Sequence, residues 1–136
     1  MRYLTLAEAF IIAEAVTGIE VQDLVHVSRS ELLDSALHAP QAGLGETDFY
    51  PSLEEKAAVL CVRIAMNHPL PDGNKRLAWL AMVVFLEIND VVLHVETDDA
   101  VKCMLSVAAG QMKEQVLSAW IRSRVQKAET NDPATE

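Results

Sequence analysis

The chain has 136 residues, the length of one domain, and 51% of them are hydrophobic while 23% are charged. This balance excludes an intrinsically disordered chain, and a content of only 5 Gly and 5 Pro favours an all-α fold over a β-sandwich or barrel. The net charge of −9 argues against general nucleic-acid binding, because phosphate backbones repel an acidic protein.

No membrane segment is expected, and the sequence predicts a cytoplasmic protein. The longest wholly apolar run, residues 77–86, is about half as long as a membrane span. The N-terminal segment carries an acidic residue early and lacks the small-residue cleavage site of a signal peptide. Cys61 and Cys103 fall inside apolar helical patterns, which is typical of free buried thiols in a reducing compartment.

Two helices are predicted at the start of the chain. A capping box at residues 5–8 opens the first helix, which is expected to end at Gly18. A short helix is expected over residues 30–37. Residues 40–51 hold turn-forming residues without periodicity, so they predict an exposed loop with a short strand near 48–50.

The next helix follows a second capping box, formed by Ser52 and Glu55. It must end near Asn67, because the two prolines that follow disfavour helical backbone at the residues before them. The charged residues 54–56, including Lys56, are expected to form a solvated face of this helix.

The rest of the chain completes the bundle. The predicted segments are a central buried helix over 74–88 that is apolar nearly all round, a brief extended stretch over 91–95, a helix from 97 to a Gly110 cap, and a last helix over 112–125. The sequence therefore predicts one all-α domain of about six helices over residues 1–125, followed by a flexible tail over 126–136.

The residues that carry chemistry form the segment HPLPDGNKR at positions 68–76, between two apolar helices. Gly73 and Asn74 open the second helix, where unpaired N–H groups and the positive end of the helix dipole attract anions. Lys75 and Arg76 add two cations to the same turn, which the dipole disfavours unless an anion compensates. This helix start therefore predicts a phosphate-binding site.

Two further residues of the segment suit phosphate chemistry. Asp72 is a hard oxygen ligand beside the anion site, which suits Mg²⁺ that bridges phosphate oxygens. His68 is a candidate general base, because a neutral imidazole accepts a proton near pH 7. Together they predict phosphoryl or nucleotidyl transfer, although the Walker pattern GxxxxGK[ST] is absent from the sequence. Taken singly, Asp72 also suits a turn or cap, and His68 suits a purely structural or solvent-exposed position.

The segment HPLPDGNKR resembles the signature loop of the Fic/Doc family, most closely its death-on-curing (Doc) branch, which reads approximately H-x-F-x-[DN]-[AG]-N-K-R. The stretch LLDSALHAPQAGLGETDFYPSLEEKAA, the FLEIND turn and the segment DDAVKCMLSVAAGQ also look like Doc-branch sequences, so the resemblance covers about residues 3–125. It implies a compact Fic-type helical bundle in which residues 43–50 match a flap that holds the target segment in extended form.

The resemblance also implies a role for each residue of the loop. His68 would match the base that activates a target hydroxyl, Asp72 would match the Mg²⁺ ligand, and Arg76 would clamp phosphate. The residues implied for ATP binding at the helix start are Gly73, Asn74, Lys75 and Arg76.

Doc proteins are toxins of toxin–antitoxin pairs. The studied type halts translation by phosphorylating a threonine of elongation factor Tu, and its antitoxin inserts a disordered C-terminal segment that folds in a groove on the toxin. The resemblance therefore implies a cytoplasmic toxin that uses ATP and Mg²⁺. Its partners would be a cognate antitoxin and a target protein such as elongation factor Tu, with no direct nucleic-acid or membrane partner.

The sequence departs from related patterns in three places. AMP-transferring Fic enzymes read G-N-G-R-x-x-R, whereas Lys75 replaces the second Gly here and Trp79 stands in place of the second Arg. Both changes favour a kinase-type reaction, because the β- and γ-phosphates lose room and a clamp in the pose for AMP transfer. Leu70 replaces the usual Phe that anchors the loop.

Control in cis has no support in the sequence. No Ser or Thr is followed by Glu four residues later, so the self-inhibitory [ST]-x-x-x-E-[GN] pattern is absent and a separate antitoxin is expected. Two alternatives stay open. They are AMP transfer to a protein and a non-catalytic Doc-like module that only binds an antitoxin.

Overall fold

The computed structural model describes residues 1–128, and most of them lie in α-helices. Within these residues the elements in chain order are α1 (Leu6–Thr17), α2 (Val21–Val27), α3 (Ser30–His38), the 3₁₀ turn η1 (Ala39–Gln41), β1 (Gly43–Leu44), β2 (Thr47–Asp48), α4 (Leu53–Asn67), α5 (Asn74–Ile88), β3 (Val91–Leu93), α6 (Thr97–Ala108), α7 (Glu114–Arg122) and β4 (Val125–Lys127). The predicted all-α fold is confirmed, with seven α-helices in the described part where about six were expected. None of these helices is long and apolar enough to cross a membrane.

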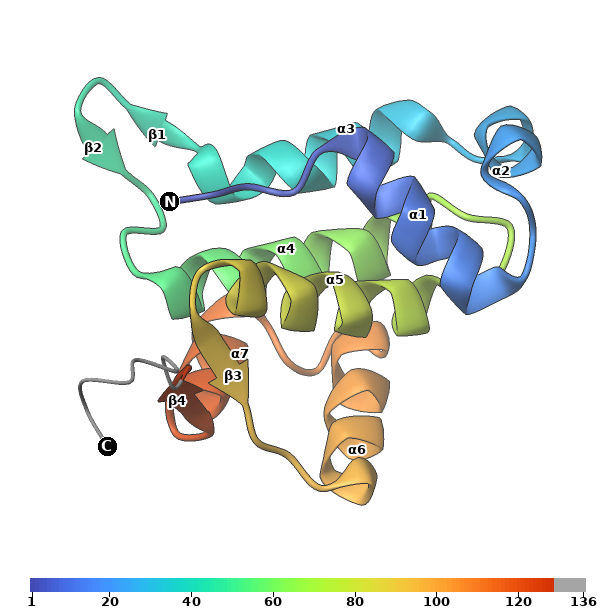
Figure 1. The fold of residues 1–136 in the computed structure, drawn as a ribbon. Helices are drawn as coiled ribbons and strands as arrows, with labels where there is room; N and C mark the ends of the chain where they lie inside the picture. The colour runs from blue at the N-terminus through green and yellow to red at the C-terminus, as the bar shows by residue number, and fades with distance from the viewer. Residues whose placement is uncertain (129–136) are drawn as a thin grey trace, which may run out of the picture.

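The helices α4 and α5 form the centre of the fold. They lie side by side and antiparallel, with α1 and α3 on one side of the pair and α6 and α7 on the other (Figure 1). The helix α4 is buried along most of its length, and α5 buries Leu77, Met82 and Phe85. Burying a large apolar side chain contributes roughly 1.5–3 kcal/mol to the free energy of unfolding. The two helices that the connecting loop joins are therefore held firmly in the core.

The helix ends follow the local signals in the sequence. The Thr5 hydroxyl accepts from the backbone N–H of Glu8 and the Glu8 carboxylate accepts from that of Thr5, which confirms the first capping box. Gly18 ends α1 with a φ of 75°, Ser52 caps α4, and α4 ends at Asn67 as predicted.

The helix α2 has no counterpart among the predicted elements. It is 7 residues long, buries Leu24 alone among its residues, and begins after Glu20 without a side-chain cap. Its sequence VQDLVHV places Val21, Leu24 and Val25 at helical spacing, but it covers only about two turns, too short a stretch for an isolated helix to be stable. Packing against α1, rather than a local signal, therefore decides that this segment is helical.

The prediction that Lys56 lies on a solvated face is wrong. Lys56 is only 4% exposed, and its Nζ donates a hydrogen bond of 3.0 Å to the carbonyl oxygen of Pro40. The ammonium also lies 3.8 Å from Asp48 Oδ2 and 5.9 Å from the centroid of the Tyr3 ring. The lysine therefore ties η1, β2 and the N-terminal segment to α4, which periodicity within α4 alone does not indicate.

The C-terminal segment departs from the prediction as well. The helix α7 ends at Arg122, and β4 pairs antiparallel with β3, so that Val91 lies opposite Lys127 and Leu93 opposite Val125. The N–H of Ala128 donates to Asp90 O at 2.8 Å. Residues 126–128 thus belong to the folded domain rather than to a tail, and the remainder of the predicted tail, 129–136, lies outside the described residues.

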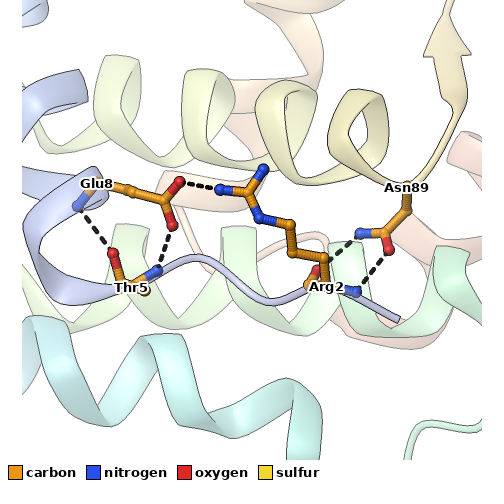
Figure 2. A network of polar contacts seen from close by, with 4 residues as sticks. All are labelled: Arg2, Thr5, Glu8 and Asn89. Carbon is orange, nitrogen blue, oxygen red and sulfur yellow. Dashed lines mark hydrogen bonds and ion pairs between the residues drawn. The ribbon is translucent and has the colours of Figure 1, made fainter.

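The N-terminal segment is fastened to the end of α5 by Asn89 (Figure 2). Asn89 Oδ1 accepts from the backbone N–H of Arg2 at 2.9 Å, and its Nδ2 donates to the Arg2 carbonyl at 2.8 Å. The Arg2 guanidinium pairs in turn with the Glu8 carboxylate. The network joins the start of α1 to the far end of α5.

Cys61 and Cys103 are free and buried, as predicted. Burial raises the pKa of the Cys103 thiol to about 11 and raises the pKa of Cys61 further above its ordinary value. Both thiols are therefore protonated near neutral pH and pack as small apolar side chains.

Candidate functional site

The segment HPLPDGNKR spans the end of α4, the connecting loop and the first turn of α5. His68 caps α4 with a left-handed φ of 51°, and Gly73 precedes α5 with a φ of 85°. The structure therefore places all the predicted site residues, from His68 to Arg76, on one short stretch of backbone. His68, Asp72, Lys75 and Arg76 are exposed, as residues that meet a ligand must be.

The contact of His68 with a backbone carbonyl distinguishes between the two neutral tautomers of its ring. Its Nδ1 lies 3.1 Å from the carbonyl oxygen of Met66. A carbonyl oxygen can only accept, so in this contact Nδ1 is the donor and the neutral ring leaves the Nε2 lone pair free. An imidazole in this tautomer can take a proton from a hydroxyl at Nε2.

The start of α5 is an electropositive point on an acidic protein. Its first intrahelical bond runs from the N–H of Leu77 to Gly73 O at 2.9 Å, so the N–H groups of Asn74, Lys75 and Arg76 precede it. The first turn holds no acidic residue. These N–H groups, the helix dipole and the two cationic side chains together suit a phosphate.

The carboxylate of Asp72 is oriented beside this helix start. Its Oδ1 accepts from the N–H of Gly73 at 2.8 Å. Within residues 1–128 no group of three or more His, Cys, Asp or Glu could hold a metal ion, and Asp72 could supply a single carboxylate. This fits Mg²⁺, which typically binds one or two carboxylates plus phosphate oxygens and waters.

The connecting loop is anchored from three directions. The side chain of Leu70 is only 3% exposed and belongs to the core, so it fills the anchoring position that Phe takes in the family pattern. The N–H of Arg29, between α2 and α3, donates to Pro69 O at 2.8 Å. The side-chain amide of Asn74 closes the loop onto the backbone of Leu70. The contact with Arg29 has no signal in the sequence.

An apolar groove begins at the same helix start. It is a cavity of about 430 Å³ between α5 and α6, lined by Lys75 and Arg76 at the start of α5 and by mainly apolar residues that include Trp79 and Met104. The ring of Trp79 packs edge-on against Trp120 of α7, with 6.2 Å between the centroids. The side chain at position 79 is therefore an aromatic ring in the lining of the groove, and it supplies no positive charge.

A model of the Fic/DOC family matches residues 4–86, which is more than half of the chain and includes every residue of the loop. The chain belongs to the Fic/DOC family. A relative named Toxin Doc, from Mycolicibacterium smegmatis, is 51% identical over 67 residues, which are 49% of this chain and 52% of the relative. The chain thus spans about half the length of the curated relative that it matches.

The segment that we expected to act as a flap, residues 43–50, does not lie next to His68 in the structure. A hairpin does form, with Gly43 opposite Asp48 and Leu44 opposite Thr47. It precedes the N-terminus of α4, whereas His68 follows the C-terminus, and the two lie at opposite ends of that helix (Figure 1). A helix of 15 residues is about 22 Å long. Direct alignment of a target at His68 by this hairpin is therefore not supported by its placement.

Proposed function

We propose that this chain is the toxin of a toxin–antitoxin module and transfers the γ-phosphate of ATP to a hydroxyl of a target protein, in a reaction that requires Mg²⁺. A threonine of elongation factor Tu is the target that the Doc resemblance implies, and its modification would halt translation. The observation that carries the proposal is the place of His68, with its Nδ1 against the Met66 carbonyl, on the same short loop as the cationic start of α5. The membership in the Fic/DOC family and the similarity to Toxin Doc support it.

The proposed step is an in-line displacement. The hydroxyl oxygen of the target attacks the γ-phosphorus, and its proton passes to Nε2 of His68. The bond between the γ-phosphorus and the oxygen that bridges to the β-phosphorus breaks, and ADP leaves. The N–H groups of residues 74–76 and the Arg76 side chain hold phosphate oxygens, while Asp72 would hold Mg²⁺, which neutralises charge on them.

The choice of the γ-phosphorus rests on positions 75 and 79. Lys75 occupies the turn where AMP-transferring enzymes have Gly, so the β- and γ-phosphates have less room there. Trp79 lies against Trp120 and offers no clamp for them. We therefore place the γ-phosphorus rather than the α-phosphorus opposite His68, with Lys75 acting as a point charge on the nucleotide.

Labelled ATP tests the reaction. The purified chain is incubated with Mg²⁺, elongation factor Tu and ATP that carries ³²P at either the γ or the α position. We expect the γ label alone to reach the target, which gains one phosphate by mass. Transfer of the α label would instead establish AMP transfer, and ATP binding without transfer of either label would favour the non-catalytic module.

Histidine variants test the base. We expect His68→Ala to lower the transfer rate by about 10²–10⁴-fold, the usual share of a general base. His38→Ala is the matched control, because its Nδ1 also contacts a backbone carbonyl, that of Asp34 at 2.9 Å, at the end of α3. An equal effect of the two variants, or none from His68→Ala, would contradict the assignment.

Calorimetry tests the phosphate and metal sites. Arg76→Ala should weaken ATP·Mg²⁺ binding, and Asp72→Asn should reduce its dependence on Mg²⁺, because a neutral amide is a poorer ligand for a hard cation. Lys127→Ala, on the exposed strand β4, controls for the loss of one positive charge. Binding that is identical in all the variants would refute the proposed site.

A further inference from the structure

The side chain of Asn74 is already engaged by the protein's own backbone. Its Nδ2 donates to the carbonyl oxygen of Leu70 at 3.0 Å, and its Oδ1 accepts from the N–H of Leu70 at 2.9 Å. The two bonds close residues 70–74 into a ring at the start of α5. These bonds use one of the two lone pairs of the amide oxygen and one of the two N–H donors of the amide, so one N–H donor remains.

The ring lies between the two groups that the proposed reaction needs. Leu70 follows His68 by two residues and is fixed in the core by its side chain. Asp72 lies inside the ring, where its own bond reaches only the adjacent Gly73 N–H at 2.8 Å. The buried Leu70 side chain and the Arg29–Pro69 bond hold the first part of the loop, whereas the Asn74 bonds tie that part to the start of α5 across Asp72.

We propose that Asn74 is a positioning residue, whose amide sets the distance and orientation between His68 and the start of α5 and whose side chain is not itself a phosphate ligand. Phosphate binding at this position then belongs to the backbone N–H of Asn74. The inference rests on the proposed function, since it concerns the alignment of the base with the phosphate.

The chain contains a matched control at the other end of the same helix. Asn89 follows the last residue of α5 and makes the same pair of bonds to Arg2 (Figure 2). Its Nδ2 also donates to Phe85 O at 2.8 Å. Asn89→Ala therefore removes a comparable side-chain clamp from α5 at a place remote from His68.

The experiment compares Asn74→Ala with Asn89→Ala. For each variant, one measures unfolding by urea, the affinity for ATP·Mg²⁺ by calorimetry, and kcat for transfer of the γ label. We expect Asn74→Ala to lower kcat by about 10–100-fold, since a misplacement of about 1 Å costs that much. Its affinity for ATP·Mg²⁺ should stay within about threefold of wild type, because an interaction used only for alignment moves kcat rather than binding. Asn89→Ala should leave kcat unchanged.

Hydrogen exchange at the Leu70 amide reports on the Asn74 clamp, that is, the two hydrogen bonds between Asn74 and Leu70, independently of activity. Exchange should accelerate in Asn74→Ala and not in Asn89→Ala, because only the first removes the acceptor of that N–H. A tenfold or larger loss of ATP·Mg²⁺ affinity in Asn74→Ala would overturn the proposal in favour of a phosphate ligand. An unchanged kcat in Asn74→Ala would overturn it as well.

These outcomes separate the inference from the proposed function. A wild-type protein that transfers no label refutes the proposed function. Acceleration of Leu70 exchange in Asn74→Ala with retained ATP·Mg²⁺ binding would then still uphold the clamp, whereas unchanged exchange would refute the clamp whatever the activity.

Discussion

Gly73 lies at the start of α5 close to the side chains of Val16 and Thr17 in α1, and its replacement by Ala tests that contact. The backbone has a φ of +85°, which costs a residue with a Cβ roughly 1–2 kcal/mol. The added Cβ would also lie 3.1 Å from Val16 Cγ1 and 3.5 Å from Thr17 Cγ2. Val16 is buried and β-branched, so it yields little, and overpacking of this kind adds about 1 kcal/mol. We expect Gly73→Ala to lower the free energy of unfolding by about 2–3 kcal/mol.

Urea unfolding with a second glycine variant separates the two contributions. Gly110 has a similar φ of +75° with nothing within 4 Å of its added Cβ, so Gly110→Ala measures the backbone cost alone, about 1–2 kcal/mol. Shortening Val16 to Ala should remove the excess, so that Gly73→Ala costs about 1 kcal/mol less in the Val16→Ala background.

Equal destabilisation by Gly73→Ala and Gly110→Ala would refute the close packing of α1 against the start of α5. So would an excess that persists when Val16 is shortened, because the steric cost would then arise elsewhere.

Two further predictions concern the N-terminal half. Lys56→Met should lower the free energy of unfolding by about 1–3 kcal/mol, because the buried carbonyl of Pro40 loses its donor. Asp48→Asn changes an exposed partner 3.8 Å from the ammonium and should cost less than about 1 kcal/mol. Equal urea midpoints for Lys56→Met and wild type would contradict this prediction. The hydrogen bond from the backbone N–H of Thr5 lowers the pKa of Glu8 below its ordinary value of 4.5. Desolvation opposes this shift, and the Thr5 hydroxyl and Arg2 add smaller contributions that lower the pKa. The ionised Glu8 carboxylate therefore contributes its full stability above about pH 4.5, and this contribution is lost as the pH falls through the lowered pKa. Glu8→Gln should make the free energy of unfolding fall less steeply with decreasing pH in the acid range. An equal fall in wild type and Glu8→Gln would contradict this prediction.

The parts of the fold that were predictable depend on interactions between near neighbours in the chain. The capping box at residues 5–8, the end of α4 before two prolines and the start of α5 at Asn74 each involve residues within about four positions of one another. Such signals act the same way in any tertiary setting. The candidate site is of this kind, because His68 and Arg76 lie on one continuous segment, so the sequence alone is enough to propose its members.

Other features depend on segments that are distant in the chain. Lys56 is buried because η1, the hairpin and the N-terminal segment converge on it, and no pattern within α4 encodes that convergence. The β3–β4 pairing joins Val91 to Lys127 across the whole of α6 and α7, and three-residue strands carry too little periodicity to be recognised.

The sequence by itself determined the helical class and the boundaries of the two central helices, because caps, prolines and apolar periodicity act locally. Only the tertiary structure decided that Leu70 is buried in the core and that Arg29 supports the loop through Pro69. These outcomes follow from how α1, α3, α4 and α5 pack, and a packing geometry is set by all the contacting side chains at once rather than by any one stretch of residues.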